Sequence, residues 1–331
     1  MTVDEFISQW NDDSESVPVF TSGSTGKPKL MMAEKKRMAA SARMTCSALR
    51  LKANDKALVC LPMDYIAGKM MVVRSLVCGL NMVCVEPSSH PLAAIDSCDD
   101  IAFAAMVPMQ VYSSLETEDE CNKLKAIKNI LIGGGAIDNE LEQRLRTFPN
   151  AVWSSYGMTE TLSHIALRRV NSGNTDDSLW YHPLPGVDVS LTDEGCLIID
   201  APRVCSTLLY TNDIAIIEEH DRRKRFRILG RKDNVVCSGG IKIQIEEVEQ
   251  KLMPCLDKPF IVSKRPSHKY GEELVLLTED TDTQMVMDVC RNILPHYWVP
   301  KDIETIEKVP LTPTGKPARA EAEKLARHSI T

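Results

Sequence analysis

Apolar segments alternate with helical patterns over about the first 160 residues of the chain. Four short apolar runs predict buried strands, at residues 57–61, 81–85, 101–107 and 130–132. Between them lie stretches whose apolar residues recur with the period of a helix, such as residues 68–77 and 138–148. This succession of strand, helix and strand predicts a parallel α/β sheet with helices packed against it.

The pattern changes twice in the remainder of the chain. Three shorter segments separated by turn residues, at 188–192, 196–200 and 214–219, predict antiparallel β structure. Beyond Asp233, two helical patterns alternate with two strand-like runs, at 245–253, 260–262, 274–277 and 283–294. The sequence therefore predicts a large α/β domain with a short antiparallel β subdomain, followed by a small α+β domain of roughly a hundred residues.

The segment FTSGSTGKPK at residues 20–29 carries the strongest chemical signal. Six of its residues are glycine or hydroxyl residues and two are lysines, so it offers free backbone N–H groups, hydroxyl donors and positive charge. It follows an apolar run at 17–20 and precedes a helical pattern at 33–49, which predicts a phosphate-binding turn between a strand and a helix. The two residues between Gly23 and Gly26 are too few for a P-loop, and G-x-G-x-x-G is absent from the segment.

Composition and charge exclude several classes of function. The chain has 331 residues, enough for one large and one small domain, and its 39 Lys and Arg against 46 Asp and Glu leave no basic surplus for nucleic acid. The longest apolar stretch, residues 70–85, is interrupted by Arg74 and is too short to span a membrane. The chain starts without signal-peptide features, and its eleven cysteines form no C-x-x-C pair, which indicates reduced thiols in a cytoplasmic protein. Cys60, Cys78 and Cys84 lie among apolar residues and are expected in the core.

Five motifs, in order, resemble those of the adenylate-forming enzymes, the superfamily of acyl-CoA synthetases, peptide-synthetase adenylation domains and luciferases. The first is S-G-S-T-G-x-P-K, within residues 20–29. The others are Y-G-M-T-E at 156–160, Y-T-N-D at 210–213, G-R-K-D at 230–233 with S-G-G-I-K beyond it, and P-T-G-K at 313–316. Asn212 stands where the family usually has glycine. The motifs extend from residue 20 to residue 316, so the resemblance covers nearly the whole chain.

The resemblance implies a two-step reaction and a two-domain fold. A substrate carboxylate attacks the α-phosphate of ATP to give an acyl-adenylate and pyrophosphate, and the thiol of CoA then displaces AMP. The implied fold has a nucleotide- and acyl-binding domain at residues 1–230, a hinge at 231–233 and a mobile C-terminal domain at 234–331. The implied cofactors and co-substrates are ATP, Mg²⁺ and CoA.

The same resemblance implies which residues act on the phosphates. Lys316 is the implied catalytic lysine, because a point charge in a Thr-Pro-Thr-Gly loop can bridge carboxylate and phosphate oxygens. Thr159 would donate to the α-phosphate, and Glu160 would bind magnesium through its carboxylate oxygens. The implied phosphate-binding residues are Thr21, Ser22, Gly23, Ser24, Thr25, Gly26 and Lys29.

Further motif residues are implied to bind the nucleoside. Tyr156, followed by Gly157, would pack on the adenine. Asp213 would accept hydrogen bonds from the ribose hydroxyls, with Arg231 donating beside it. Three consecutive glycines follow a predicted strand and either let the purine approach the backbone or form an ordinary turn: Gly133, Gly134 and Gly135.

Three residues are implied to serve the second half-reaction. Asp233 is the hinge residue about which the small domain would swing between the two steps. Gly239 and Gly240 would then line the tunnel for the pantetheine arm of CoA.

Residues 61–69 resemble the family's acyl-pocket motif, and the longer pattern that ends at Arg74 resembles o-succinylbenzoate–CoA ligases. The implied substrate-binding residues are Tyr65, where an aromatic residue or histidine is usual, Gly68, Lys69 and Arg74. Arg74 lies inside an otherwise apolar helical pattern, where an unpartnered guanidinium is costly. It either binds a second carboxylate of the substrate, with Lys69 assisting, or it pairs with a protein acid or reaches the surface.

The chain also departs from the family. Only nineteen residues precede Phe20, whereas full-length members have a much larger N-terminal domain. We therefore expect an N-terminally trimmed acyl-CoA synthetase-like fold, in which a homodimer would cover surface that the missing part buries. Activation of o-succinylbenzoate for menaquinone biosynthesis is the first hypothesis. The alternatives are another acyl- or aryl-CoA ligase, a stand-alone adenylation domain that loads a carrier protein, and a degenerate nucleotide-binding protein.

Overall fold

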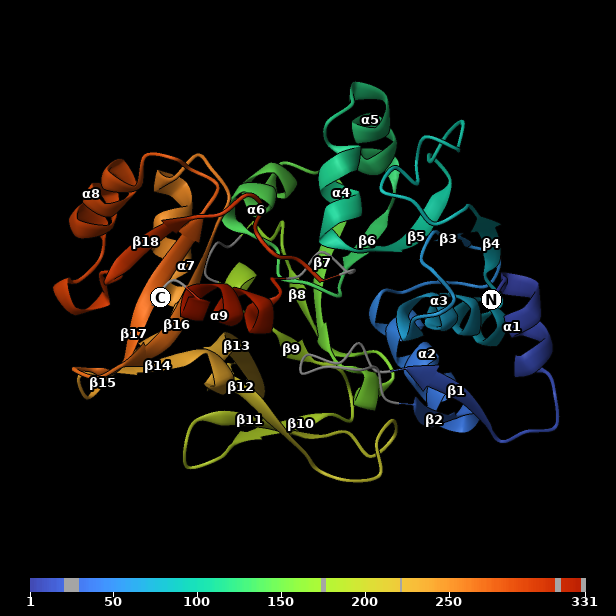
Figure 1. Cartoon of the computed structure of the whole chain (residues 1–331). Helices are drawn as coiled ribbons and strands as arrows, with labels where there is room; N and C mark the ends of the chain where they lie inside the picture. Colours follow the sequence, from blue (N-terminus) through green and yellow to red (C-terminus); the bar gives the residue numbers. More distant parts are fainter. Residues whose placement is uncertain (21–29, 174–176, 221, 313–316, 329–331) are drawn as a thin grey trace. The chain divides into compact units, whose positions relative to one another are not determined.

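The computed structural model describes residues 1–20, 30–173, 177–220, 222–312 and 317–328 (Figure 1). The chain divides into two compact units. Unit 1 consists of Met1–Ser190, Ile198–Tyr210 and Ile217–Arg227, and unit 2 consists of Leu191–Leu197, Thr211–Ile216 and Ile228–Thr331. The two units are described separately below.

A seven-stranded sheet forms the centre of unit 1, with the strand order β4-β3-β5-β6-β7-β8-β9. Its strands are β3 (Lys56–Val59), β4 (Asn81–Cys84), β5 (Ile101–Met106), β6 (Asn129–Ile132), β7 (Ala151–Gly157), β8 (His164–Arg169) and β9 (His182–Pro183). The pairs from β4 to β7 are all parallel, and β8 and β9 add antiparallel pairs. The predicted parallel α/β sheet is confirmed, and β5 has all six residues buried because it lies inside the sheet.

Six helices belong to this unit: α1 (Val3–Trp10), α2 (Lys35–Ala48), α3 (Ile66–Cys78), α4 (Pro108–Ser114), α5 (Glu118–Ala126) and α6 (Asn139–Arg146). Local sequence sets several of their ends. The side chain of Asp138 accepts a hydrogen bond from the N–H of Leu141 and caps α6, and α3 ends at Gly79 with φ +69°. Apolar side chains of α4, α5 and α6 join those of β3, β5, β6 and β7 in one buried cluster.

The segment before α2 differs from the prediction of a turn between a strand and a helix. The strand β1 (Ser16–Phe20) pairs antiparallel with a second strand, β2 (Leu30–Glu34), and α2 begins only after β2. The pairing of Phe20 with Leu30 brings the two ends of residues 21–29 together. The prediction missed β2 because its sequence, L-M-M-A-E, shows no alternation of apolar and polar residues.

A second correction concerns the strand β4. Its residues are exposed or half-buried, because it lies at the edge of the sheet, whereas a buried strand was expected. Cys84, at the end of this strand, is accordingly exposed, and Cys78 is half-buried. Cys60 is buried as expected, all eleven cysteines are free, and Cys237 and Cys255 are exposed as well.

A four-stranded sheet follows, in which consecutive strands are neighbours: β10 (Asp188–Leu191), β11 (Cys196–Asp200), β12 (Leu209–His220) and β13 (Arg223–Arg231). These strands confirm the short β subdomain that the turn-rich sequence predicts. The boundary between the units passes along this part of the chain, since Leu191–Leu197 and Thr211–Ile216 belong to unit 2.

A further sheet forms the centre of unit 2, with the strand order β15-β14-β17-β16 and β18 paired to β17. Its strands are β14 (Val235–Ser238), β15 (Ile241–Gln244), β16 (Phe260–Ser267), β17 (Gly271–Thr278) and β18 (Asp302–Thr305), and its helices are α7 (Ile245–Leu252), α8 (Thr283–Ile293) and α9 (Arg319–His328). Alternate residues of β17 enter two cores: Leu274 and Leu276 pack with α7 and α8, and Val275 and Leu277 pack with α9. The predicted α+β fold is confirmed.

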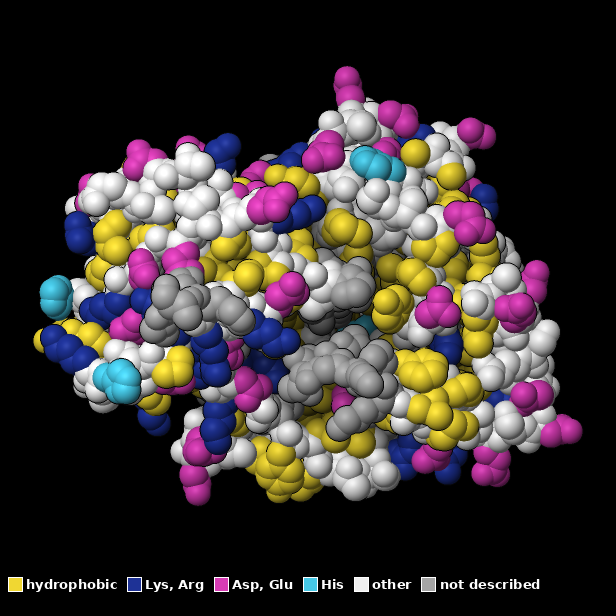
Figure 2. Space-filling view, viewed as in Figure 1, with side chains coloured by type: hydrophobic (Ala, Val, Ile, Leu, Met, Phe, Trp, Pro, Cys, Tyr) yellow, Lys and Arg dark blue, Asp and Glu magenta, His cyan; other side chains and the backbone are white. Residues whose placement is uncertain are grey.

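The surface carries charges of both signs. Figure 2 shows acidic and basic side chains interspersed among the described residues of the face in view. Among the described residues, no helix is both long enough and apolar enough to cross a membrane.

Candidate active site

The carboxyl ends of two adjacent parallel strands bring together several of the predicted site residues in unit 1. Gly133, Gly134 and Gly135 follow β6, and Tyr156 and Gly157 end β7, which pairs with β6. Ligands of open α/β sheets bind beyond the carboxyl ends of the strands. Local packing and backbone conformation also require glycine at two of these positions. A Cβ at position 133 would lie 2.4 Å from the Ser155 hydroxyl, and Gly134 has φ +77°.

The turn after β7 presents Thr159 and Glu160. It contains a short 3₁₀ helix, η1 (Thr159–Thr161), and the Thr161 hydroxyl donates to the Ser163 carbonyl at 2.7 Å. Leu162 adopts φ +64°, an uncommon conformation for a residue with a side chain. A Cβ at Gly157 would lie 2.4 Å from the Ser163 carbonyl oxygen, so only glycine allows the chain to fold back here. Glu160 is exposed and has no basic partner among the described residues.

Tyr156 lies in an aromatic cluster. Its ring is 5.2 Å from the ring of Phe226 in an edge-to-face arrangement and 5.8 Å from that of Tyr181. These contacts explain the position of the side chain without a ligand. Its role as an adenine contact therefore stays a prediction.

Arg74 is the most unusual charged residue of unit 1. The α3 side chain is only 2% exposed, and its guanidinium lies over the ring of Phe103, with 6.0 Å between its central carbon and the ring centroid. Nη2 donates to the Ser163 hydroxyl, Nη1 lies 3.6 Å from the sulfur of Met71, and Nε has no partner. No carboxylate of the described residues pairs with it, and burial lowers the pKa of Arg74 to about 10.

This geometry removes two of the explanations that the sequence left open for Arg74. The side chain neither reaches the surface nor pairs with an acid of the described residues. A buried cation without a counter-ion is costly. The remaining explanation from the sequence, a second carboxylate of the substrate, stays a prediction.

The other predicted acyl-pocket residues have different surroundings. The Lys69 ammonium is buried, donates to the Pro18 carbonyl at 2.7 Å and lies 5.9 Å from the centroid of the Phe6 ring. Its contacts therefore give no support to the expectation that it assists Arg74. Tyr65 is 38% exposed at the start of α3. A Cβ on Gly68 would lie 2.2 Å from the Pro62 carbonyl oxygen, so close packing explains this glycine.

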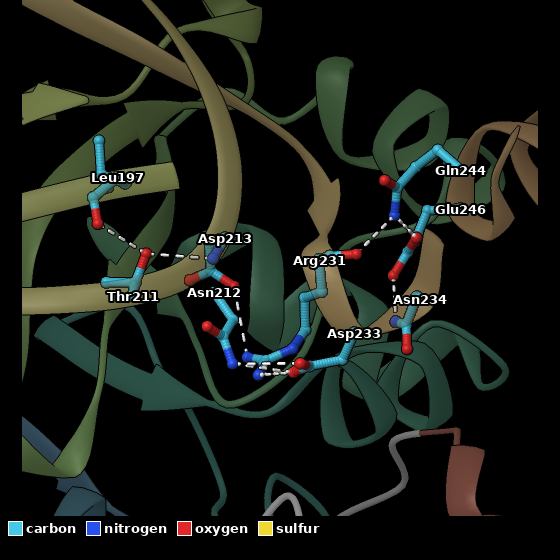
Figure 3. Close-up of polar contacts among 9 residues, drawn as sticks. All are labelled: Leu197, Thr211, Asn212, Asp213, Arg231, Asp233, Asn234, Gln244 and Glu246. Carbon is cyan, nitrogen blue, oxygen red and sulfur yellow. Dashed lines mark hydrogen bonds and ion pairs between the residues drawn. The ribbon is translucent and has the colours of Figure 1, made fainter. Parts of the chain in front are cut away.

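In unit 2, one arginine lies between two carboxylates (Figure 3). Arg231 donates to Asp213 at 3.3 Å and to Asp233 at 2.8 Å. The amide of Asn212, which replaces the usual glycine, donates to both oxygens of Asp233 at 3.2 Å. These hydrogen bonds, that of Arg231 first, lower the pKa of Asp233. The hinge motif and the Asp213 motif are thus joined within this unit.

A hydrogen bond from Gln244 holds the backbone of Arg231. The Gln244 amide donates to the Arg231 carbonyl at 3.0 Å and to the Glu246 carboxylate, which also accepts from Asn234 (Figure 3). A Cβ at Gly230 would lie 2.4 Å from the Gln244 amide nitrogen. The glycine of the G-R-K-D motif therefore makes room for this contact.

Gly239 and Gly240 form the two-residue turn between β14 and β15. Ser238 pairs with Ile241, and the two glycines have φ +57° and φ +83°. Positive φ at both central residues is typical of a type I′ hairpin turn, for which glycine is preferred. The hairpin alone explains both glycines, and their contact with pantetheine stays a prediction.

Eight predicted site residues lie outside the described part of the chain: Thr21, Ser22, Gly23, Ser24, Thr25, Gly26, Lys29 and Lys316. Their roles stay predictions from the sequence.

The sequence did not point to Thr45, Ser163, His164 or Gln244. Ser163 and His164 come two and three residues after the end of the Y-G-M-T-E-T motif, and this proximity was the available signal. The bonds that give them importance reach residues 89 and 119 positions away, and no local pattern reveals such contacts.

The sequence is similar to a known enzyme family and to named members of it. The family model described as AMP-binding enzyme matches residues 7–200. A 2-succinylbenzoate–CoA ligase of Enterococcus faecalis is 26% identical over an alignment that covers 94% of this chain and 70% of that protein.

Solved structures show the same likeness. An acyl-CoA synthetase (AMP-forming)/AMP-acid ligase II-like protein from Dyadobacter fermentans is 33% identical, with a TM-score of 0.64, and the match covers 96% of this chain and 91% of that one. The O-succinylbenzoate coenzyme A synthetase of Bacillus subtilis, solved with ATP and magnesium, is 22% identical with a TM-score of 0.77, over 92% of this chain and 69% of that one. The family model spans more than half of the sequence, and the chain belongs to the AMP-binding enzyme family.

Proposed function

We propose that this protein is an AMP-forming acid–CoA ligase whose acyl substrate carries a second carboxylate, with 2-succinylbenzoate as the best candidate. The family match supports carboxylate activation, and the names of several relatives supply the candidate acid. The observation that carries the proposal is Arg74, a buried guanidinium with an unpaired Nε and no carboxylate partner among the described residues.

A substrate carboxylate would complete the surroundings of Arg74. The guanidinium presents several N–H donors in one plane, which suits a two-point contact with a carboxylate. The charge is already desolvated, so the attraction is stronger than at a surface. In this arrangement the ring carboxylate of 2-succinylbenzoate is held by Arg74, and the succinyl carboxylate is left to react.

In the first step an oxygen of the succinyl carboxylate attacks the α-phosphorus of ATP, and the bond to pyrophosphate breaks. Both reactants are anions, so the step needs fixed positions and positive charge more than acid–base chemistry. Lys316 would bridge the two, Thr159 would donate to the α-phosphate, and the hydroxyls and N–H groups of residues 21–29 would hold the outer phosphates.

The residues present fit a magnesium ion. Glu160 is exposed, its carboxylate is a hard oxygen ligand, and no basic side chain of the described residues neutralises it. The described residues form no cluster of three potential metal ligands, so phosphate oxygens would complete the coordination. The ion would neutralise phosphate charge, and Glu160 would set its place.

Asp213 and Arg231 would bind the ribose of the nucleotide, with Arg231 held by Asp233 as well. In the second step the sulfur of CoA attacks the acyl carbon and AMP leaves. Asp233 would be the hinge residue between the two steps, and Gly239 and Gly240 would line the path of pantetheine.

Mass spectrometry of the reaction products tests the proposed function. The purified protein is incubated with ATP, magnesium, CoA and 2-succinylbenzoate, or with 4-oxo-4-phenylbutanoate, benzoates or fatty acids in its place. We expect 2-succinylbenzoyl-CoA, AMP and pyrophosphate. A thioester of a monocarboxylic acid alone would overturn the substrate, and an acyl-adenylate without thioester would indicate a carrier-protein acceptor.

The variant Arg74→Lys tests the carboxylate contact. Lysine keeps the charge but loses the planar donors, so we expect the KM for 2-succinylbenzoate to rise roughly tenfold or more, with the KM for ATP unchanged. The KM for 4-oxo-4-phenylbutanoate, which lacks the ring carboxylate, should not change. Arg43→Lys, on the exposed face of α2, is the matched control. Equal effects of Arg74→Lys on both acids would contradict the proposed contact.

A further inference from the structure

A line of buried hydrogen bonds extends from Arg74 into the interior of unit 1. The Arg74 Nη2 contacts the Ser163 hydroxyl, which lies 3.2 Å from Nδ1 of His164. Nε2 of His164 lies 3.1 Å from the hydroxyl of Thr45, and that hydroxyl donates to the Ser41 carbonyl at 3.2 Å. The line thus joins α3, the turn after β7, the start of β8 and helix α2.

The two ends of this line, together with a neutral imidazole, determine the direction of every hydrogen bond in it. Arg74 can only donate, and the carbonyl of Ser41 can only accept. The Ser163 hydroxyl accepts from Arg74 and keeps its own proton, which it donates to Nδ1 of His164 when that nitrogen carries no proton. The Thr45 hydroxyl donates to Ser41, so it accepts a proton from Nε2. His164 is therefore the neutral tautomer that carries its proton on Nε2.

Burial supports the neutral state of the imidazole. His164 is 6% exposed and Thr45 is fully buried. Burial first, and then the charge of Arg74, lower the pKa of His164 well below its usual value. A second ring proton, on Nδ1, would leave the Ser163 hydroxyl unable to donate its own proton to this nitrogen. It would also put two cations close together.

We propose that His164 and Thr45 are positioning residues, which act through Ser163 to hold the Arg74 guanidinium in the orientation that receives the second carboxylate of the substrate. The proposal rests on the proposed function of Arg74. Fixing Nη2 on Ser163 restricts rotation of the guanidinium plane and leaves the buried Nε without a partner among the described residues, so the line of hydrogen bonds sets the preference for dicarboxylic acids.

The test compares His164→Gln with His164→Leu. The amide of glutamine has one acceptor and one donor, spaced like the two ring nitrogens, so it can replace both bonds, whereas leucine makes neither. We expect the KM for 2-succinylbenzoate to rise at least tenfold in His164→Leu and to stay within about threefold of wild type in His164→Gln. The KM for ATP and for 4-oxo-4-phenylbutanoate should not change in either variant.

Two NMR measurements test the positioning without using activity. The ¹⁵N signals of the His164 ring, assigned by their loss in His164→Gln, should show the neutral tautomer with the proton on Nε2. The guanidinium signals of Arg74 should be distinct in wild type and His164→Gln, and averaged in His164→Leu. His182→Leu, which replaces an exposed histidine of the same unit, is the control.

The outcomes separate this inference from the proposed function. Arg74 signals that stay distinct in His164→Leu, or a proton on Nδ1, would overturn the positioning role. If Arg74 loses its order in His164→Leu while Arg74→Lys leaves the KM for both acids unchanged, then the proposed function fails and the hydrogen-bonded line remains. Should His164→Leu fail to fold, Thr45→Val removes the last acceptor at nearly constant volume and is expected to change the KM in the same direction.

Discussion

At the scale of single residues, unit 1 contains a line of buried polar side chains that are hydrogen-bonded to one another. Arg74, Ser163, His164 and Thr45 each supply what the next one needs. Of the buried side-chain nitrogen and oxygen atoms in these four residues, only the Nε of Arg74 has no partner in the part of the chain that the structure describes. Removing one member of such a network leaves its neighbour unpaired, which costs more than the net value of the lost bond.

The neutral state of His164 predicts a pH dependence of stability. The pKa of His164 is lower in the folded protein than in the unfolded chain, so the unfolded chain binds more protons as the pH falls below about 6.5. This contribution to stability is full above that pH and decreases as the pH falls. We expect the melting temperature of wild type to fall more between pH 7.5 and 5.5 than that of His164→Gln, measured by calorimetry. Equal decreases would show that the imidazole is not held neutral.

The sequence could identify Arg74, because a lone charge in an apolar helical pattern is visible locally. It could not reveal what the charge contacts, since Ser163 is far away along the chain. For Lys69, the neighbours in the sequence suggested a contact that the structure does not show. It lies next to a substrate-pocket glycine in the sequence, but its ammonium contacts the carbonyl of Pro18 in β1.

At the scale of elements, the start of α3 is set by close packing. Gly68 lies in the first turn of the helix, and the place of its missing side chain is taken by the carbonyl of Pro62. Any side chain there must push the helix away from the segment that precedes it. The segment predicted to form the acyl pocket therefore includes a glycine for a structural reason.

The variant Gly68→Ala measures this packing. The added methyl group would overlap a backbone oxygen that cannot rotate away, so we expect a loss of roughly 1–3 kcal/mol in the free energy of unfolding. Denaturant unfolding gives the value. Gly173→Ala, where a Cβ meets nothing within 4 Å, is the control and should change stability little. A Gly68→Ala variant as stable as its control would mean that α3 shifts without cost.

Elements with clear periodicity were predictable, including the parallel strands, α3, α6, α7 and α8, whereas α9 was not predicted. Short or weakly alternating strands were not. The last two residues of β2 were included in the predicted helix and its first three were assigned to no element, and β4 was taken as buried although it lies at an edge. The order of strands in a sheet decides which strands have neighbours on both sides, and the local pattern of apolar residues does not reveal that order.

At the scale of the whole molecule, the division of the chain is less simple than a single boundary. Unit 2 takes Leu191–Leu197 and Thr211–Ile216 from the region before its main segment begins at Ile228. These short segments belong to paired strands, and the composition of the sequence does not show with which unit a paired strand makes most of its contacts. The expected hinge at residues 231–233 and the homodimer both stay predictions.

The assignment of Lys316 to the first of the two half-reactions is testable at this scale. Lys316 is expected to serve only adenylation, because charge is needed where two anions meet and not where a neutral acyl group is transferred. We therefore expect Lys316→Ala to lower the rate of acyl-adenylate formation by roughly a hundredfold or more, the loss typical when one electrostatic contact to the transition state is removed. Pyrophosphate release measures this step.

Preformed acyl-adenylate mixed with CoA measures the other step and should react at the wild-type rate. A Lys316→Ala variant that releases pyrophosphate at the parental rate would remove this lysine from the mechanism.

The exposed thiols provide labelling sites from which the distance between the two units can be measured by fluorescence. Cys84 belongs to unit 1, whereas Cys237 and Cys255 belong to unit 2. Replacing Cys237 with serine leaves one exposed thiol in each unit, and each can carry a fluorescent dye. Energy transfer between the dyes would then follow the separation of the units before ATP is added, after the adenylate forms and after CoA binds.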